Sequence, residues 1–238
     1  MFMQMVQLNL VGWAKTYLIY DIKSNECALI DPVYDFTSQY MNKISEMNLD
    51  LRMCIATHTH ADHITGCFGI AEQTGCDYVM WHSTASLGVT LYVDQTTSLY
   101  LGDNEINFHH VPGHTEDSML VITSSHIFTG DFLFTGEGGA GRDDLPSGRI
   151  KAHWDSLQSL RNLSGGLLVC TGHEPPGVEM QTLDWNRENN PVLRMNNYSE
   201  YEIWQSETTA QLGYVSKIKV ALPANLFGEL PEEIPWLN

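Results

Sequence analysis

The sequence has few basic residues. Its 238 residues contain 12 Lys and Arg against 29 Asp and Glu, which gives a formal net charge of −17 at pH 7. A chain of this charge repels phosphate backbones and anionic membrane surfaces, so we expect neither nucleic acid nor a membrane as a partner. The same scarcity makes any basic residue near a pocket informative, and Arg142 and Arg149 are the first candidates.

The sequence also lacks paired cysteines, an apolar run long enough to span a membrane, and a basic and apolar leader. Five cysteines make an odd count without any C-x-x-C pair, which argues against a disulfide framework and against a cysteine zinc cluster. We therefore expect reduced thiols in the interior. The absence of a leader and of a membrane segment predicts a cytoplasmic protein.

Short apolar runs rich in β-branched residues recur along the chain, and they predict strands. The runs are TYLIY, CALIDPV, RMCIAT, DYVM, EINFHH, MLVIT, HIFTG and LLVCTG. Helical spacing of apolar residues predicts helices at about 36–47, 62–73 and 153–163. Strand clusters with helices between them favour a layered α/β or α+β sandwich. We expect one domain over residues 1–238, with the polar, proline-punctuated residues 186–238 as an extension packed on it.

Histidines and aspartates follow four of the apolar runs. The stretch THTHADH, residues 57–63, comes after one run, and three others lead to His114, Asp131 and His173. Because strand ends can deliver such side chains to one edge of a sheet, we expect them to converge. Imidazoles and carboxylates are common metal ligands, so the sequence predicts a metal site. The candidate ligands are His58, His60, Asp62, His63, His114, Asp131 and His173.

Some of these residues have simpler interpretations. Asp62 and His63 are predicted to begin a helix, which an aspartate can cap. The glycine-rich stretch 136–141 lacks the lysine and the helix start of a phosphate-binding loop, so we interpret it as an active-site loop. Other histidines lack the strand-end context and are expected to be core or solvated residues: His82, His109, His110, His126 and His153.

These motifs resemble those of the metallo-β-lactamase fold superfamily, whose members fold as an αββα sandwich with metals at one edge of two packed sheets. Within the superfamily, the sequence resembles the persulfide dioxygenases, also called sulfur dioxygenases, and after them glyoxalase II. The narrower resemblance rests on flanking stretches and extends over nearly the whole chain. The stretches are TYLIYDIKSNECALIDPV, GRDDLPSG, NNPVL and VALPAN.

The resemblance implies one Fe(II) per chain, bound by His58, His114 and Asp131. Two histidines and one carboxylate leave three positions open on the ion, enough for O₂ and a persulfide sulfur. In the implied reaction a persulfide R–S–SH binds as its anion, O₂ adds to the terminal sulfur, and hydrolysis releases sulfite and the thiol. The remaining residues of the set would orient ligands and waters: His60, Asp62, His63 and His173.

The sequence departs from the family pattern at four positions that bear on the substrate. Ala140 replaces a cysteine, Asp143 a threonine, Pro175 a tyrosine and Val192 an arginine. In family members several of the replaced side chains help to hold glutathione. Arg142 is retained, and we expect it to bind a substrate carboxylate through two parallel hydrogen bonds. The resemblance therefore implies a low-molecular-weight thiol persulfide and O₂ as substrates, with weak use of glutathione persulfide.

Two other functions remain open. One is a dinuclear hydrolase of glyoxalase II type, in which all seven ligands bind two zinc or mixed ions and a metal-bound hydroxide attacks a thioester. The other is a non-catalytic or redox-sensing binding protein that retains the metal. Metal stoichiometry distinguishes the first, and absence of turnover despite full metal loading indicates the second. The sequence leaves the oligomeric state open, a homodimer included.

Overall fold

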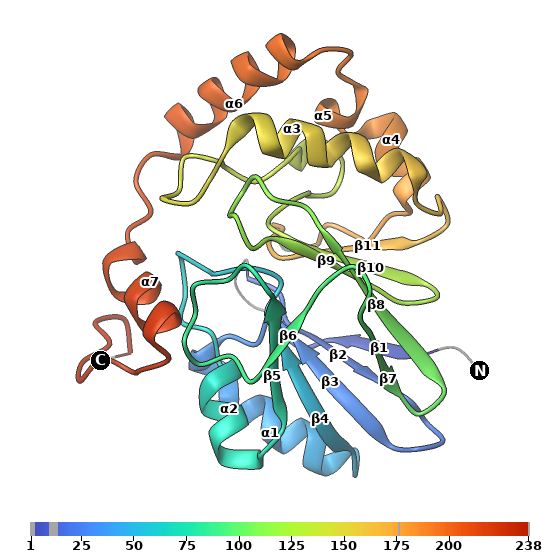
Figure 1. Cartoon of the computed structure of the whole chain (residues 1–238), viewed down its shortest axis with the longest axis vertical. Coiled ribbons are helices and arrows are strands. Elements are labelled where there is room, and N and C mark those ends of the chain that lie inside the picture. Colours follow the sequence, from blue (N-terminus) through green and yellow to red (C-terminus); the bar gives the residue numbers. More distant parts are fainter. Residues whose placement is uncertain (1–2, 10–13, 176, 238) are drawn as a thin grey trace.

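Two β-sheets packed face to face form the centre of the computed structural model, which describes residues 3–9, 14–175 and 177–237 (Figure 1). The first sheet has six strands in the order β1 (Gln4–Gln7), β2 (Tyr17–Tyr20), β3 (Glu26–Ile30), β4 (Asp50–Ile55), β5 (Asp77–Trp81) and β6 (Leu91–Val93). The second has five, in the order β11 (Leu168–Thr171), β10 (His126–Gly130), β9 (Met119–Ile122), β8 (Asn104–His110) and β7 (Ser98–Leu101).

The central strands β2 and β3 of the first sheet are buried on both faces, which explains why they read as nearly unbroken apolar runs. Successive side chains of a strand point to opposite faces. In β2, Tyr17 and Ile19 lie in the core between the two sheets, whereas Leu18 lies in the core between the first sheet and its covering helices. A strand buried on both sides has no reason to alternate apolar with polar residues.

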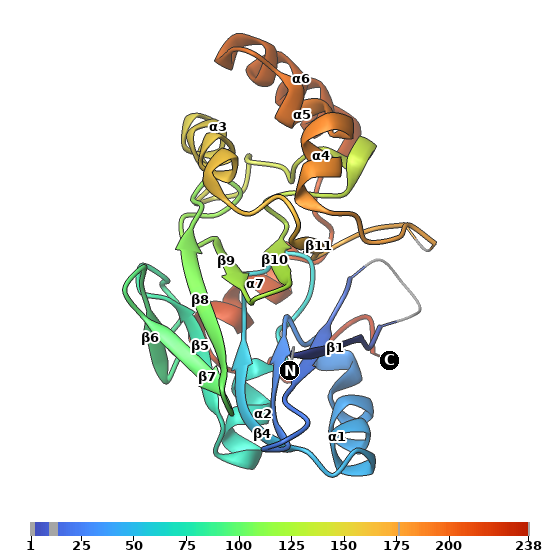
Figure 2. The same cartoon turned by 90° about the vertical axis from the view of Figure 1, so that its right-hand side faces the viewer.

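Helices cover the outer face of each sheet (Figures 1 and 2). Residues of α1 (Thr37–Glu46), α2 (Cys67–Thr74) and α7 (Ile218–Phe227) pack with the first sheet. Residues of α3 (Ile150–Ser159), α4 (Leu183–Asn189), α5 (Pro191–Arg194) and α6 (Tyr198–Leu212) pack with the second. Short 3₁₀ turns lie at Tyr34–Phe36, Gly136–Gly138 and Leu160–Asn162. The predicted αββα sandwich is confirmed.

Each predicted strand run occurs as a strand, and the helices predicted near 36–47 and 153–163 occur as α1 and α3. The helix predicted from Asp62 is wrong at its start, because α2 begins at Cys67. The backbone N–H groups of Thr65 and Gly66 bind the side chain of Asn225 and the carbonyl of Pro32. These contacts fix the preceding residues as a loop, and Asp62 therefore caps no helix.

Much of the C-terminal segment is helical, in α5, α6 and α7. The helix α7 contains Pro223, which removes one helical hydrogen bond. Because a proline inside a run disfavours a helix, the sequence pattern did not indicate one here. The helices α6 and α7 bury Tyr201 and Ala221 in the cores of the second and first layer, respectively. The organisation into one domain with an appended 186–238 segment stays a prediction. In the described part of the chain, no helix combines the length and the apolar character needed to cross a bilayer.

Candidate metal centre

The seven predicted ligands come together at one edge of the two sheets. They follow the ends of β4, β8, β10 and β11, and they fall into three overlapping groups whose candidate ligand atoms lie within 4.8 Å of one another. The groups are His58, His114 and Asp131; His60, Asp62 and His63; and Asp62, Asp131 and His173. Strands from both sheets contribute, so the site exists only when the sandwich is assembled.

Two histidines present their Nε2 atoms to the same oxygen of Asp131. His114 Nδ1 donates to the carbonyl of Arg142 at 2.5 Å, and His58 Nδ1 lies 2.9 Å from the hydroxyl of Thr57. These contacts at Nδ1 direct each Nε2 inward, to 3.8 Å (His114) and 4.0 Å (His58) from Asp131 Oδ2. The result is a face of two imidazole nitrogens and one carboxylate oxygen, the ligand set of mononuclear non-haem iron sites.

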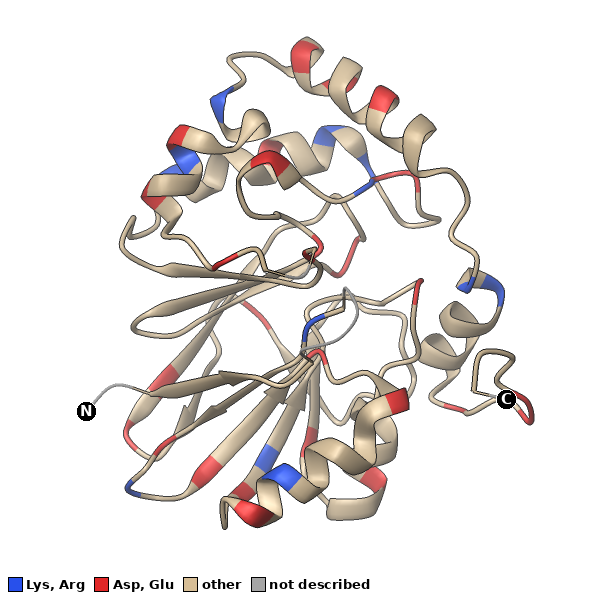
Figure 3. Cartoon of the chain, turned by 180° about the vertical axis from the view of Figure 1, so that it is seen from behind, with Lys and Arg blue, Asp and Glu red and all other residues tan. Residues whose placement is uncertain are grey.

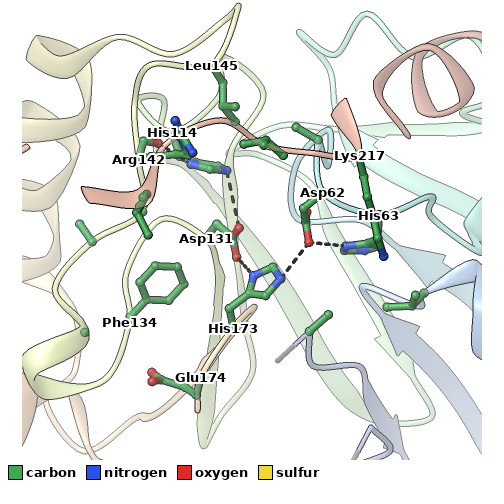
Figure 4. Close-up of a pocket in the computed structure, with 18 of the residues that line it drawn as sticks. Asp62, His63, His114, Asp131, Phe134, Arg142, Leu145, His173, Glu174 and Lys217 are labelled. Atoms are coloured by element: carbon green, nitrogen blue, oxygen red, sulfur yellow. Dashed lines mark hydrogen bonds and ion pairs between the residues drawn. The ribbon is translucent and has the colours of Figure 1, made fainter. Parts of the chain in front are cut away.

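The other carboxylate oxygen of Asp131 is bound by His173. His173 Nδ1 contacts Asp131 Oδ1 at 2.7 Å, and its Nε2 contacts Asp62 Oδ2 at 3.0 Å (Figure 4). Both ring nitrogens of His173 are therefore engaged by carboxylates. In this arrangement His173 orients Asp131 and Asp62 and has no free nitrogen to offer a metal.

Two further histidines have a free ring nitrogen. His60 Nε2 lies 3.2 Å from Asp31, and His63 Nδ1 lies 3.1 Å from Asp62. Among the described residues, the buried ring nitrogens without a hydrogen-bond partner include His58 Nε2, His60 Nδ1 and His63 Nε2. A buried nitrogen is costly to leave unpaired, so each of these atoms fits a metal or a metal-bound ligand.

The environment favours neutral imidazoles in the group formed by His58, His114 and Asp131. Burial lowers the pKa of both His58 and His114, which keeps their Nε2 lone pairs available for a metal. Burial alone would raise the pKa of Asp131, but the charge and hydrogen bond of His173 hold it below its ordinary value. His173 has the opposite shift: burial would lower its pKa, and Asp131 and Asp62 raise it well above the usual range.

Glycines permit the close approach of the strands that carry the ligands. Gly130 has φ +49°, and a Cβ there would lie 2.2 Å from the hydroxyl oxygen of Thr57 and 3.0 Å from His58 Nδ1. Gly113 lies so close to His153 that a Cβ on residue 113 would fall 2.3 Å from the Cα of His153. At both positions only a residue without a side chain fits this close approach.

The C-terminal helices hold the loops of the site through side-chain amides. Asn225 Nδ2 donates to the carbonyls of His60 and His63, both at 2.9 Å, and Asn225 Oδ1 accepts from Thr65 N at 2.9 Å. Asn190 likewise donates to the carbonyls of Phe134 and Gly139. The NNPVL and VALPAN stretches contain these asparagines, but sequence analysis did not reveal what the amides bind.

The comparisons with known proteins agree with this geometry. Residues 14–173 match the Metallo-beta-lactamase superfamily. The chain belongs to this superfamily. The mouse protein named persulfide dioxygenase ETHE1, mitochondrial, is 31% identical over 216 residues, which cover 89% of this chain and 82% of that protein. The crystal structure of ETHE1 from Myxococcus xanthus superposes with a TM-score of 0.86 at 28% identity, covering 95% of this chain and 98% of that one.

The predicted resemblance to both branches of the superfamily is confirmed. A hydroxyacylglutathione hydrolase from Pectobacterium atrosepticum is 29% identical over 153 residues, which cover 64% of this chain and 59% of that protein. The ETHE1 relatives match more of the chain. The protein is an enzyme of the metallo-beta-lactamase superfamily and a homologue of the ETHE1 persulfide dioxygenases.

A cavity of about 690 Å³ opens beside the ligands of this metallo-beta-lactamase site. Its lining includes Ala140 and Pro175, two of the positions that depart from the family pattern. Val192 is different: it is 1% exposed within the core of the second layer and does not line the cavity. An arginine at this position would bury its charge in that core, so we do not expect Val192→Arg to add a glutathione contact.

The two arginines singled out from the sequence differ in their environment. Arg142 lines the cavity, but its guanidinium binds both carboxylate oxygens of Asp144 at 2.6 and 2.7 Å. Arg149 is exposed and donates to backbone carbonyls. The substrate contact expected of Arg142 stays a prediction. Sequence analysis did not single out Lys217, which also lines the cavity.

The remaining histidines lie outside the three ligand groups. His153 is fully buried and contacts the carbonyl of Phe132 at 2.9 Å, and burial lowers its pKa to about 3. His109 is half-buried beside Ser159, and His82 is exposed. These positions agree with the prediction of core and solvated histidines.

Asp143 gives a testable pH dependence. Burial, with repulsion from Asp144, raises the pKa of Asp143 to about 6, and Asp143 Oδ2 has no hydrogen-bond partner. A carboxylate with a raised pKa destabilises the fold above that pKa, and the effect vanishes below the unfolded pKa of about 3.9. We expect Asp143→Asn to raise the free energy of unfolding by about 1 kcal/mol at neutral pH, discounted for partial exposure, with no gain near pH 4.

Urea unfolding at the two pH values measures this difference. Asp144→Asn is the matched control, because the hydrogen bonds from Arg142 lower the pKa of Asp144. The control should lower stability at neutral pH. A gain at Asp143 that is equal at both pH values would contradict the electrostatic explanation.

Proposed function

We propose that this protein is an Fe(II)-dependent persulfide dioxygenase, which oxidises the sulfane sulfur of a low-molecular-weight thiol persulfide with O₂ to sulfite and thiol. The observation that supports it best is how the two carboxylate oxygens of Asp131 are shared among three histidines. Asp131 Oδ2 faces the Nε2 atoms of His58 and His114, while Asp131 Oδ1 is bound by His173. This arrangement provides one face of three ligands. It also engages His173, the histidine that a second metal ion would require.

The residues divide the work as follows. His58, His114 and Asp131 would hold the iron, which when bound supplies the activation of O₂. His173 holds Asp131 in the ionised form with Oδ2 directed at the two histidines. His60, Asp62 and His63 would orient waters and ligands around the centre. The cavity beside Asp131 and His114 accepts the thiol part of the substrate.

A dinuclear thioester hydrolase is the second candidate. The unpaired buried nitrogens His60 Nδ1 and His63 Nε2 favour it, because these atoms could bind additional metal. A second ion would need His173 to release Asp62 or Asp131, to which it is hydrogen-bonded at 3.0 and 2.7 Å. The hydrolase therefore requires a rearrangement that the dioxygenase does not.

Metal content and oxygen uptake test the proposal. We expect protein purified without oxygen to contain one iron per chain and to consume O₂ with thiol persulfides while releasing sulfite. Two zinc or mixed ions per chain, with hydrolysis of a thioester of glutathione and no oxygen uptake, would establish the hydrolase instead. Full metal loading without turnover of either compound would favour the non-catalytic binding protein.

The setting of the reaction stays a prediction. The partners we propose are a small thiol persulfide and O₂, with no nucleic acid or membrane, and a homodimer remains open. Figure 3 shows acidic residues in both layers and few basic ones, which fits the exclusion of polyanionic partners. We propose a cytoplasmic location for this protein. The mouse and human relatives differ in this respect, because their names give them as mitochondrial.

A further inference from the structure

Away from the metal ligands, the cavity offers a substrate several apolar side chains. Val33, Phe36, Phe134, Leu145 and Val215 are among its lining residues, and they come from both layers and from the segment between α6 and α7. The metal ligands His114 and Asp131 lie at one part of this lining. A substrate with its reacting sulfur there must place the rest of its thiol portion along the apolar walls.

Arg142 and Lys217 are the arginine and lysine side chains that line the described part of the cavity. The guanidinium of Arg142 is occupied by Asp144 through two hydrogen bonds. An arginine whose two parallel donors are engaged by one carboxylate has little left for another. Arg142 is therefore poorly suited to bind the carboxylate of a substrate unless Asp144 releases it.

Lys217 forms no ion pair with the described carboxylates. The described lysines that form ion pairs are Lys23, Lys43 and Lys151, and Lys217 is not among them. Its ammonium group instead lies 4.6 Å from the centre of the Trp236 ring. A cation–π contact holds an ammonium group in place without neutralising it, so Lys217 can still bind an anion. In Figure 4, Lys217 is drawn on the right of the view and Arg142 on the left.

One carboxylate lies at the same part of the cavity. Asp35 lines the cavity and accepts a hydrogen bond from Trp236 Nε1 at 3.4 Å, so the indole contacts both Asp35 and Lys217. The other lining acids are engaged: Asp62 and Asp131 by His173, and Glu174 by the backbone N–H of Thr135. Asp35 would repel a second carboxylate on a substrate that Lys217 already binds.

We propose that Lys217 forms the anion-binding subsite of this cavity, and that the substrate class is a thiol persulfide with a single carboxylate and an otherwise apolar body. This inference rests on the proposed dioxygenase function. The carboxylate pairs with the ammonium group of Lys217, while the persulfide sulfur lies at Asp131 and His114. A dicarboxylate such as the glutathionyl group meets Asp35 with its second charge and is used poorly.

Matched substrates and variants test the subsite. The substrates are the persulfide of a three-carbon thiol carboxylic acid and the persulfide of its carboxamide, which have nearly the same shape, but only the first carries a carboxylate charge. The variants are Lys217→Met, which keeps the apolar stem, Lys217→Arg, which keeps the charge, and Lys219→Met as control. Lys219 is exposed, lies two residues away and does not line the cavity.

We expect Lys217→Met to raise KM for the carboxylate persulfide about tenfold, as for loss of one charge-assisted contact, with kcat unchanged. KM for the carboxamide should not change. Lys217→Arg should restore most of the affinity, and Lys219→Met should resemble the parent protein. Asp35→Asn should lower KM for glutathione persulfide more than for the monocarboxylate.

A binding measurement distinguishes failure of the subsite from failure of the reaction. The S-methyl thioether of the carboxylic acid cannot form a persulfide, and its dissociation constant for the metal-loaded protein can be measured by calorimetry. We expect Lys217→Met to weaken this binding about tenfold and Lys219→Met to leave it unchanged. If neither persulfide causes oxygen uptake but the thioether still binds in a Lys217-dependent way, the proposed dioxygenase function is wrong and the subsite is supported. An equal loss for carboxylate and carboxamide, or no change in Lys217→Met, would overturn the subsite itself.

Discussion

Protein carrying Asp131→Ala is expected to bind no iron, whereas protein carrying His173→Ala keeps iron and turns over slowly. Asp131 Oδ2 is the oxygen that faces both His58 Nε2 and His114 Nε2, so its removal leaves two neutral ligands only. His173 acts through Asp131 Oδ1, and loss of such an outer contact typically costs about 10–100-fold in metal affinity or activity.

Iron content after anaerobic loading and dialysis measures the first effect, and a competition titration with a chelator measures the second. His109→Ala is the matched control, because His109 is half-buried beside Ser159 and belongs to none of the ligand groups. The control should bind iron like the parent protein. Equal and complete metal loss in Asp131→Ala and His173→Ala would mean that His173 is a ligand and that the site holds a second ion.

The second large effect is expected at Asn225, far from the metal ligands in the sequence. Asn225→Ala removes both hydrogen bonds to the carbonyls of His60 and His63 and the acceptor of Thr65 N. Each buried backbone group left unpaired costs about 1–3 kcal/mol, so the loop between His60 and Thr65 should loosen or shift. We expect metal affinity to fall at least tenfold together with a lower free energy of unfolding.

Asn225→Asp separates the two halves of this contact. An aspartate retains an acceptor for Thr65 N but turns the donor toward His60 and His63 into a second acceptor, which repels the two carbonyls. We expect its metal affinity to fall as in Asn225→Ala. The control is Asn104→Ala, which breaks hydrogen bonds to Asp21 and Leu101 away from the site. A comparable loss of stability in all three variants, with unchanged metal affinity, would reduce Asn225 to a structural residue.

The metal centre depends on two distant parts of the chain. The ligands come from the loops after four strands, whereas the amide that fixes the loop between His60 and Thr65 comes from α7 near the C-terminus. Truncation of the C-terminal helices should therefore affect the metal site without touching any ligand. This connection accounts for the presence of the VALPAN stretch in a sequence whose metal motifs lie before residue 174.

Much of this protein could be read from the sequence because local chemistry determines it. Eight of the described strands follow from apolar runs, whereas β1, β6 and β7 were not predicted. The central strands of the first layer were the clearest, since a strand buried on two faces has no polar positions to obscure it. The seven ligand candidates follow from histidines and aspartates at strand ends, where a sheet delivers them to one edge. The net charge of −17 and the unpaired cysteines likewise need only composition.

Other features depend on contacts between distant residues. The start of α2 was misplaced because Asn225 and Pro32 take the backbone N–H groups of Thr65 and Gly66, and neither partner is near in the sequence. The burial of Val192, which removes it from the cavity, depends on how α5 packs on the second layer. The contact between Arg142 and Asp144 is local in the sequence. Its consequence for substrate binding is visible only because the structure places Arg142 in the lining of the cavity.

The sequence by itself determined the superfamily, the sandwich and the set of residues that can bind metal, because residue types at strand ends specify them without reference to distant contacts. Only the tertiary structure decided how those residues share their bonds: which oxygen of Asp131 faces the histidines, which carboxylates engage His173, and which cation of the cavity is free. Hydrogen bonds and ion pairs are exclusive, so their assignment requires the positions of all competing partners at once.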